Sequence, residues 1–437
     1  MARLTYDPSG RLLFTEEMKK EYTILFPQML PVHFKMMENC FRLHGYKAEM
    51  LTSTHHGIVE EGLKYVHNDT CYPALLVIGQ LIDAVKSGNY DPHKVALLIT
   101  QTGGGCRASN YIHLLRKSLE KAGLSFVPVI SLSLSGLEKN PGFHLGLRLL
   151  RQLVFSIMYG DLIVLLANQC RPYEQTVGTT NALVDTWMNQ LIAEFSRGKG
   201  LSFNSMQANF DRIVSEFEAL PCSSDKKVRV GIVGEIYVKY SPLGNNNLEQ
   251  FLLDEGAEPV VPGLIDFIIF KTYNRIADID LYGGSQAKHF IAGIMMRYAE
   301  RCQRAMIDAI KKSSRFLAPS PFSHLHELVR GYLGDGNKMG EGWLLTAEML
   351  ELIHAGTPNI VCAQPFGCLP NHIVGKGMVH KLKDDYPFSN IVTIDYDPGA
   401  TKINQENRIK LMLANSRRMT LHKEEASQIE TKEKTRA

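Results

Sequence analysis

The chain has 437 residues, of which 45% are hydrophobic and 21% charged, and its formal net charge is +3 at pH 7. At about 150 residues per domain, this length predicts two or three compact units with an ample core. The small net charge argues against a nucleic-acid or membrane surface. Residues 1–7 lack the apolar core of a secretory signal, and the apolar run 153–167 is shorter than the ~20 residues that span a bilayer. We therefore expect a cytoplasmic protein whose eight cysteines are reduced thiols.

The first part of the chain alternates short apolar runs with amphipathic segments. The pattern predicts strands over residues 23–26, 48–51, 95–100 and 126–132, and helices over residues 31–43, 72–85 and 108–121. Residues 95–100 have apolar side chains on both faces, which is typical of a central parallel strand. After an N-terminal extension over residues 1–20, we predict an α/β lobe over residues 21–140.

The second part of the chain begins with residues 141–225, which have helical periodicity and are predicted to form a helical connector. A second α/β lobe is predicted over residues 226–415, with a helical insertion over about 271–340. Its predicted strands are 228–234, 260–261, 359–363 and 391–395, and its predicted helices are 247–255, 343–355, 372–383 and 405–415. The polar, charge-rich residues 416–437 are predicted to be a disordered tail.

The predicted fold class is therefore α/β, with two Rossmann-like or flavodoxin-like lobes that contain parallel sheets and are joined by helical insertions. Open parallel sheets bind their ligands at the carboxyl ends of the strands. Two such lobes that face each other are expected to leave a cleft between them, and a small molecule would bind in that cleft.

Three of the eight cysteines share one kind of position, the turn between a strand and a helix. Cys71 and Cys368 lie at predicted helix starts, and Cys106 follows the strand 95–100 directly. Helix N-termini stabilise thiolates and other anions, so these turns are suited to a thiolate-bound iron–sulfur cluster. Cys362 lies within a strand and is predicted to be a core residue, with a ligand role left open. The other cysteines are predicted to be small buried or incidental thiols; they are Cys40, Cys170, Cys222 and Cys302.

The glycines Gly103, Gly104 and Gly105 precede Cys106 and allow several interpretations. They form a tight turn, a weak phosphate cradle, or a place where a bulky inorganic cluster approaches the backbone. The turn lacks the Lys-Ser/Thr pair of a Walker loop, which argues against nucleotide binding. Structural zinc sites favour paired cysteines two to four residues apart, and this sequence has no such pair.

Five segments of the sequence resemble the 2-hydroxyacyl-CoA dehydratase superfamily. More narrowly, they resemble the C-terminal module of the large anaerobic proteins described as CoA-protein activases or dehydratase-activase-related proteins. The resemblance extends over roughly residues 20–415. The segments that carry it are residues 68–74, 101–111, 340–343, 364–372 and 394–400.

The resemblance implies two α/β lobes around a 4Fe-4S cluster or a double-cubane cluster, with Cys71, Cys106 and Cys368 as ligands. Three well-placed cysteines favour a single cubane. The resemblance also implies that electrons come from a separate ATP-dependent activator protein of the actin/hexokinase type. A second dehydratase-like subunit or a second copy of this chain is a further expected partner, and an acyl-CoA is the expected small-molecule substrate.

The resulting hypothesis is a low-potential redox component, either a 2-hydroxyacyl-CoA dehydratase-like lyase or an ATP-dependent reductase. Glu235, Glu341 and His372 are candidate proton carriers, and each is equally well interpreted as a helix cap or a solvated residue. Arg107 is expected to neutralise cluster charge, to bind an anionic group or to be a plain surface residue. The alternative functions are a non-catalytic electron-transfer or scaffolding subunit and a zinc-stabilised protein without a redox role.

Overall fold

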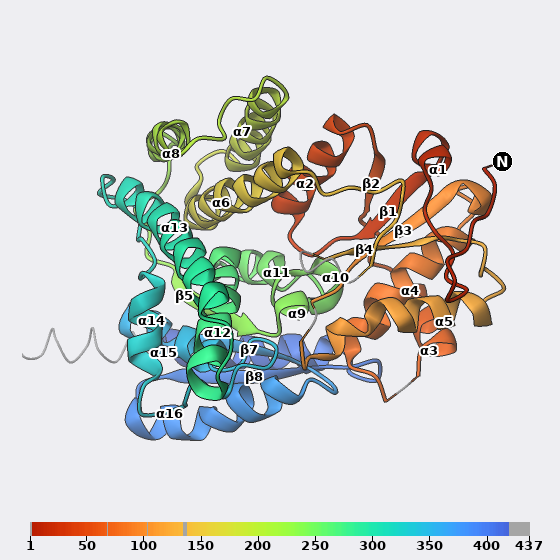
Figure 1. Cartoon of the computed structure of the whole chain (residues 1–437). Coiled ribbons are helices and arrows are strands. Elements are labelled where there is room, and N and C mark those ends of the chain that lie inside the picture. The colour runs from red at the N-terminus through yellow and green to blue at the C-terminus, as the bar shows by residue number, and fades with distance from the viewer. Residues whose placement is uncertain (1, 68, 103, 134–137, 419–437) are drawn as a thin grey trace, which may run out of the picture.

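The computed structural model describes residues 2–67, 69–102, 104–133 and 138–418 (Figure 1). It confirms the predicted α/β class, because it contains two parallel sheets of four strands each, flanked by helices. The first sheet has the order β2-β1-β3-β4 and the second the order β6-β5-β7-β8. The strands are β1 (Thr23–Pro27), β2 (Lys47–Leu51), β3 (Val95–Thr100), β4 (Val129–Leu132), β5 (Val228–Gly234), β6 (Ala257–Val260), β7 (Asn359–Pro365) and β8 (Asn390–Tyr396).

The two sheets share the same topology, in which the chain reverses its direction across the sheet after the second strand. β1 pairs with both β2 and β3, and β5 pairs with both β6 and β7, all in parallel. Ligands of such sheets bind outside the carboxyl ends of the strands next to this reversal. The turns that follow β3, β5 and β7 therefore lie where a functional site is expected.

Helices cover both faces of the first sheet. The helices are α1 (Glu16–Glu21), α2 (Pro31–Leu43), α3 (Gly57–Tyr65), α4 (Tyr72–Lys86) and α5 (Tyr111–Lys121). Successive residues of β3 enter different cores, because Leu98 packs with α2 and α6 whereas Leu97 packs with α4. The core around α4 continues into the second sheet, where it includes Val361 of β7. The apolar core around α4 thus extends through both lobes.

The connector and the insertion are helical and share one apolar core. In Figure 1 the connector lies above the strands β7 and β8. The connector contains α6 (Leu147–Cys170), α7 (Thr179–Ser196) and α8 (Phe203–Glu218). The second lobe contributes α9 (Ile236–Tyr240), α10 (Pro242–Asn245), α11 (Leu248–Asp254), α12 (Leu264–Tyr282), α13 (Gln286–Ile310), α14 (Phe322–Val329), α15 (Leu344–His354), α16 (Val379–Asp385) and a helix over residues 402–418. Trp187 and Trp343 are both fully buried in the core that these helices form.

Several segments differ from the sequence prediction. Instead of one helix over residues 372–383, the chain forms a π-turn over Asn371–Gly375, a 3-10 turn over Lys376–Met378 and then α16. The glycines Gly375 and Gly377 interrupt the helical periodicity there, since glycine lowers helix stability. Residues 416–418 are helical, so the predicted disordered tail starts too early, and its remaining residues 419–437 lie outside the described part of the chain.

The helix α6 is longer than the apolar run that the sequence analysis recognised. By length and composition, residues Leu147–Tyr173 form the one described helix that meets the criteria for a membrane span, with a mean hydropathy of 1.7. However, 61% of that window is buried inside the protein. Buried polar residues of α6 also bond to protein groups, as when Gln152 donates to the carbonyl of Phe195. We therefore interpret α6 as a core helix.

Candidate functional site

The three cysteines singled out from the sequence lie at helix or turn starts near the carboxyl ends of strands. Cys71 is the N-cap of α4, and Cys106 is the N-cap of a 3-10 turn between β3 and α5. Cys368 follows β7 and precedes the π-turn at Asn371. Cys71 is buried, whereas Cys106 and Cys368 are half-buried. The predicted turn between a strand and a helix is confirmed for Cys106 and Cys368. It is wrong for Cys71, which lies between the helices α3 and α4, although Cys71 does begin a helix as predicted.

Cys71 and Cys368 come from different lobes and are brought together by backbone contacts. The N–H of Tyr72 donates to the carbonyl of Phe366 at 3.0 Å, which joins the start of α4 to the turn after β7. Gly367 has a φ of +73°, and a Cβ on it would lie 3.0 Å from the Cα of Cys71. Glycine is therefore required at this position by both its conformation and its close approach. The turn that contains Cys368 rests directly on the turn that contains Cys71.

Cys106 lies near Cys71, because the charges of both cysteines affect the pKa of Tyr111. The hydroxyl of Tyr111, in the first turn of α5, lies 2.9 Å from the Sγ of Cys71. Burial, together with the charges of Glu341, Glu235 and Cys71, raises the pKa of Cys106 to about 11. The structure therefore brings all three cysteines into one electrostatic neighbourhood. Tyr111 was part of a recognised motif but was not predicted to be a site residue.

Burial dominates the protonation of the three thiols. It raises the pKa of Cys71, Cys106 and Cys368, and the buried carboxyl groups nearby act in the same direction. Backbone N–H groups at the helix starts oppose this effect, for example those of Ala74 at Cys71 and Asn371 at Cys368. Helix starts are expected to favour thiolates, but here the loss of solvation outweighs the effect of these amides on the pKa values of the thiols.

Glu235 and Glu341 form a buried acidic pair at the start of α9. Glu235 caps this helix by accepting the N–H of Val238 at 2.9 Å, and Glu341 accepts the N–H of Ile236 at 3.0 Å. Burial and the neighbouring Glu341 raise the pKa of Glu235 to about 8. Burial also raises the pKa of Glu341. The cap interpretation and the proton-carrier interpretation are therefore compatible, because a capping carboxyl group here titrates near neutral pH.

Lys271 is a site residue that the sequence did not indicate. Its ammonium group donates to the carbonyl of Gly340, next to Glu341. Burial lowers the pKa of Lys271, whereas the charges of Glu341 and Cys106 raise it. Lys271 lies in α12, far from the motifs in the sequence, and nothing in its sequence context distinguishes it from an ordinary exposed lysine of a helix. Only the packing of α12 against the segment before Glu341 brings it to the site.

His372 and Arg107 lie at the exposed edge of the site. Gln364 donates from its side-chain amide to the Nδ1 of His372 at 2.7 Å, and the His372 ring is solvent-exposed. Arg107 donates from Nη1 to the carbonyl of Asp69 at 2.9 Å. Neither residue belongs to the buried group of thiols and carboxyls.

Packing explains in part why the turn before Cys106 contains glycines. The N–H of Gly104 donates to the Oγ of Ser109 at 2.7 Å. A Cβ on Gly105 would collide with the side chain of Met339, so glycine allows a loop of the second lobe to reach this turn. Gly103 lies outside the described residues.

Cys362 lies apart from the three cysteines. It is fully buried in the middle of β7, where its register partner on β8 is Thr393. Burial raises its pKa to about 12, and the charged groups that affect it are Asp395, Glu348 and Lys376. These surroundings agree with the interpretation of Cys362 as a core residue.

An open pocket lies beside Cys71 between the two lobes. It has a volume of about 170 Å³. The first lobe lines it with Leu63, Thr70 and Tyr72, and the second with Phe366, Asp397 and Pro398. Drug-sized ligands occupy about 300–1,000 Å³, so this space suits a small acyl group but is too small for a complete coenzyme A.

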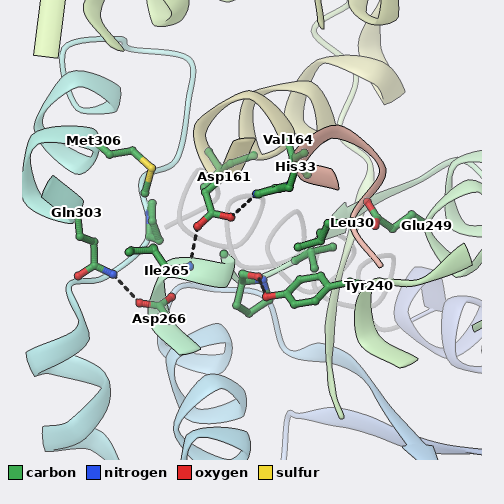
Figure 2. A pocket seen from close by; sticks show the side chains of 15 residues that line it. Leu30, His33, Asp161, Val164, Tyr240, Glu249, Ile265, Asp266, Gln303 and Met306 are labelled. Carbon is green, nitrogen blue, oxygen red and sulfur yellow. Dashed lines mark hydrogen bonds and ion pairs between the residues drawn. The ribbon is translucent and has the colours of Figure 1, made fainter. Parts of the chain in front are cut away.

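A second pocket, shown in Figure 2, is a buried polar junction. Asp161 of α6 accepts the N–H groups of Leu264 and Ile265 at 2.9 and 2.7 Å, which are the first residues of α12. The Nε2 of His33, from α2, lies 2.8 Å from the same carboxylate. Asp161 therefore joins three helices, and we assign it a structural role.

The sulfur atoms of Cys71, Cys106 and Cys368 are not grouped closely enough to bind one metal ion together. Within the described ranges, no three His, Cys, Asp or Glu side chains are grouped closely enough to hold one metal ion. Ligands of a single zinc ion all lie about 2.0–2.3 Å from one atom, whereas the thiolates of a cluster bind separate irons. Metal coordination deprotonates a thiol outright, so burial of these thiols is compatible with cluster binding.

Comparisons with protein-family models and with curated proteins found no match to this chain.

Proposed function

We propose that this chain is an iron–sulfur redox protein of the 2-hydroxyacyl-CoA dehydratase type. The observation that carries the proposal is the hydrogen bond from Tyr72 to Phe366, which joins the turn of Cys71 to the turn of Cys368. Cys106 lies in the electrostatic field of the same group. These thiols come from the start of α4 and from the turns after β3 and β7, so both lobes supply them, and they would hold a 4Fe-4S cluster with one iron left open.

Cys71, Cys106 and Cys368 would hold the cluster. When bound, the cluster would supply low-potential electrons and an iron with an open coordination position. Three ligands support a single cubane rather than a double one. Tyr111 would orient the sulfur of Cys71 through its hydroxyl group, and Asn371 approaches the sulfur of Cys368 at 3.7 Å with its side-chain amide.

The acidic pair would move protons beside the thiols. With a pKa of about 8, Glu235 retains its proton at neutral pH and is able to donate it to a departing hydroxyl group. Glu341 and Lys271 influence each other's charge, and Glu341 also raises the pKa of Glu235, so the protonation of Glu235 would depend on this buried acid–base group.

The substrate and the partners are further parts of the proposal. The pocket beside Cys71 would take the acyl part of an acyl-CoA or another small acceptor. Arg107, which is exposed next to Cys106, would bind an anionic group or neutralise cluster charge. An ATP-dependent activator of the actin/hexokinase type would supply electrons in the cytoplasm. Exposed apolar side chains next to Cys368 offer this activator or a second dehydratase-like subunit a nearby contact surface; they are Phe366, Leu369 and Ile373.

The second candidate is an electron relay or scaffolding subunit without catalysis of its own. The small volume of the pocket favours this alternative, because much of a CoA thioester would remain outside it. An EPR titration of the reduced protein distinguishes the two functions. A cluster signal that changes when acyl-CoA thioesters are added supports catalysis, whereas an unchanged signal supports a relay.

The ligand assignment is tested by iron and acid-labile sulfide per chain after anaerobic purification. We expect about four irons per chain, and we expect Cys106→Ala and Cys368→Ala to lose most of them. The matched controls Cys40→Ala and Cys302→Ala, at buried cysteines of α2 and α13, should keep their iron. Equal iron loss in all four variants would refute the ligand assignment, and zinc without sulfide would refute the redox function.

A further inference from the structure

Two cysteines outside the candidate site meet at one arginine. Cys170, the last residue of α6, is fully buried, and Cys222 is half-buried in the segment between α8 and β5. The Nη2 of Arg315 lies 3.3 Å from the Sγ of Cys170 and also contacts the Sγ of Cys222. Because both sulfur atoms contact the same nitrogen atom, the two thiols are close in space although they are far apart in the sequence.

The guanidinium group of Arg315 is held in place by the end of α8. Its Nη1 donates to the carbonyl oxygens of Leu220 and Glu218 at 2.9 and 3.3 Å. The opposite nitrogen is therefore directed at the two sulfurs. A cation next to a sulfur stabilises the thiolate, which is the nucleophilic form of cysteine.

The segment that carries Cys222 is fixed against the end of α6. The N–H of Ser223 donates to the carbonyl of Tyr173 at 2.7 Å, and the N–H of Gln175 donates to that of Pro221 at 3.1 Å. These bonds lie on either side of Cys222 and hold its backbone beside the residues that follow Cys170. The pair is thus pre-positioned by the fold.

We propose that Cys170 and Cys222 form a redox-active thiol pair that a hydroperoxide converts into a disulfide. The Cys222 thiolate attacks an oxygen of the hydroperoxide; an S–O bond forms, the O–O bond breaks, and the leaving oxygen takes a proton to become water or an alcohol. The Cys170 sulfur then attacks the sulfur of Cys222. An S–S bond forms, the S–O bond breaks, and the hydroxide leaves as water with the proton of Cys170. Two thiols are oxidised and one hydroperoxide is reduced.

The different environments of the two thiols assign the order of these steps. Cys222 is the more exposed thiol and therefore meets the oxidant first. Cys170 is fully buried and its sulfur shares the Arg315 contact with Cys222, so it acts in the second, resolving step, once Cys222 has been oxidised. The disulfide would link α6 to the segment that enters β5 and close a loop that contains α7 and α8. This inference is independent of the proposed cluster function.

The test treats the full-length, fully reduced protein with hydrogen peroxide and maps its disulfides by mass spectrometry. We expect a peptide that links Cys170 to Cys222, lighter by about 2 Da than the two reduced peptides. Cys170→Ser should leave Cys222 as a sulfenic acid that dimedone traps, and Cys222→Ser should leave Cys170 unmodified. Cys40→Ser is the matched control and should keep the link. Oxidation of other cysteines without a Cys170–Cys222 link would overturn the proposal.

The role of Arg315 is tested by the rate at which the link forms. Arg315→Gln should slow the reaction severalfold, because the variant removes the cation that contacts both sulfur atoms. Arg315→Lys keeps the positive charge and should retain most of the rate. Equal rates in the wild type and Arg315→Gln would overturn the role of the arginine. If the Arg315 variants do not fold, the cysteine variants still decide whether the pair forms.

Discussion

Glu235 and Glu341 show how burial changes the chemistry of single side chains. Both residues accept backbone N–H groups at the start of α9, as helix caps do. Their burial raises their pKa values, and the proximity of the two carboxyls raises that of Glu235 further. The structure therefore shows both carboxyl groups bonded to the start of α9, while their role in proton transfer stays a prediction.

The raised pKa of Glu235 predicts a specific dependence of stability on pH. The unfolded carboxyl loses its proton near pH 4.5, whereas the folded one keeps it up to about pH 8. Between these values the folded state binds more protons, so the free energy of unfolding decreases as the pH rises and levels off above pH 8. Glu235→Gln should reduce this decrease, as measured by urea unfolding at pH 5 and pH 8. An unchanged decrease in the variant would contradict the assignment.

The turn after β7 shows how an element positions the site. Gly367 combines a left-handed backbone conformation with direct contact to the backbone of Cys71. The residues on either side, Phe366 and Cys368, supply the interlobe hydrogen bond and a candidate ligand. The π-turn that follows begins at Asn371, whose amide points to the sulfur of Cys368. The irregular backbone of this segment thus belongs to the site.

Gly367→Ala is expected to separate the two turns. The added methyl group meets the Cys71 backbone, and the φ of +73° is unfavourable for alanine, so we expect a destabilisation of about 2–3 kcal/mol by urea unfolding. Gly356→Ala is the matched control, because Gly356 has a φ of +75° but no atom within 4 Å of its added Cβ. It should cost only about 1 kcal/mol. Equal losses in both variants would show that contact with Cys71 does not matter.

At the scale of the whole molecule, buried polar groups connect helices from different parts of the chain. Asp161 of the connector receives hydrogen bonds from the start of α12 in the second lobe and pairs with His33 of the first lobe (Figure 2). The apolar core around α4 also includes residues of both sheets. The two lobes are therefore held in a fixed relation by shared packing and by this polar junction.

Asp161→Ala should destabilise the whole protein. It leaves two N–H groups of α12 and the ring of His33 without their partner, and breaking a buried pair costs about 3–5 kcal/mol. The control Asp211→Ala removes an exposed ion pair with Lys312 and should cost less than about 1 kcal/mol. Both losses are measured as changes in the free energy of unfolding in urea. Similar values for the two variants would contradict the structural role of Asp161.

The sequence predicted the regular elements well where periodicity and glycine stops were clear. β3, β5 and α2 begin and end at the predicted residues. The segment after Asn371 was predicted to be one continuous helix, but it contains a π-turn and a 3-10 turn before α16. Gly375 and Gly377 lower helix stability there, but their positions in the sequence do not show which kind of turn forms. The helix α12 was not predicted from the sequence, because its apolar residues do not follow a narrow stripe along one face of the helix. Seven of its residues are buried, and two of these, Asp266 and Asn274, are polar.

The sequence by itself determined the α/β class and the placement of Cys71, Cys106 and Cys368 at helix or turn starts, because local periodicity and turn residues decide both. The tertiary structure decided that Lys271 and Tyr111 lie at these turns, and that Glu235 and Glu341 share one buried space. It also brought the sulfur atoms of Cys170 and Cys222 into contact with the same arginine, Arg315. Contacts between residues far apart in the chain depend on how helices pack, and burial sets the protonation of a side chain only once that packing exists.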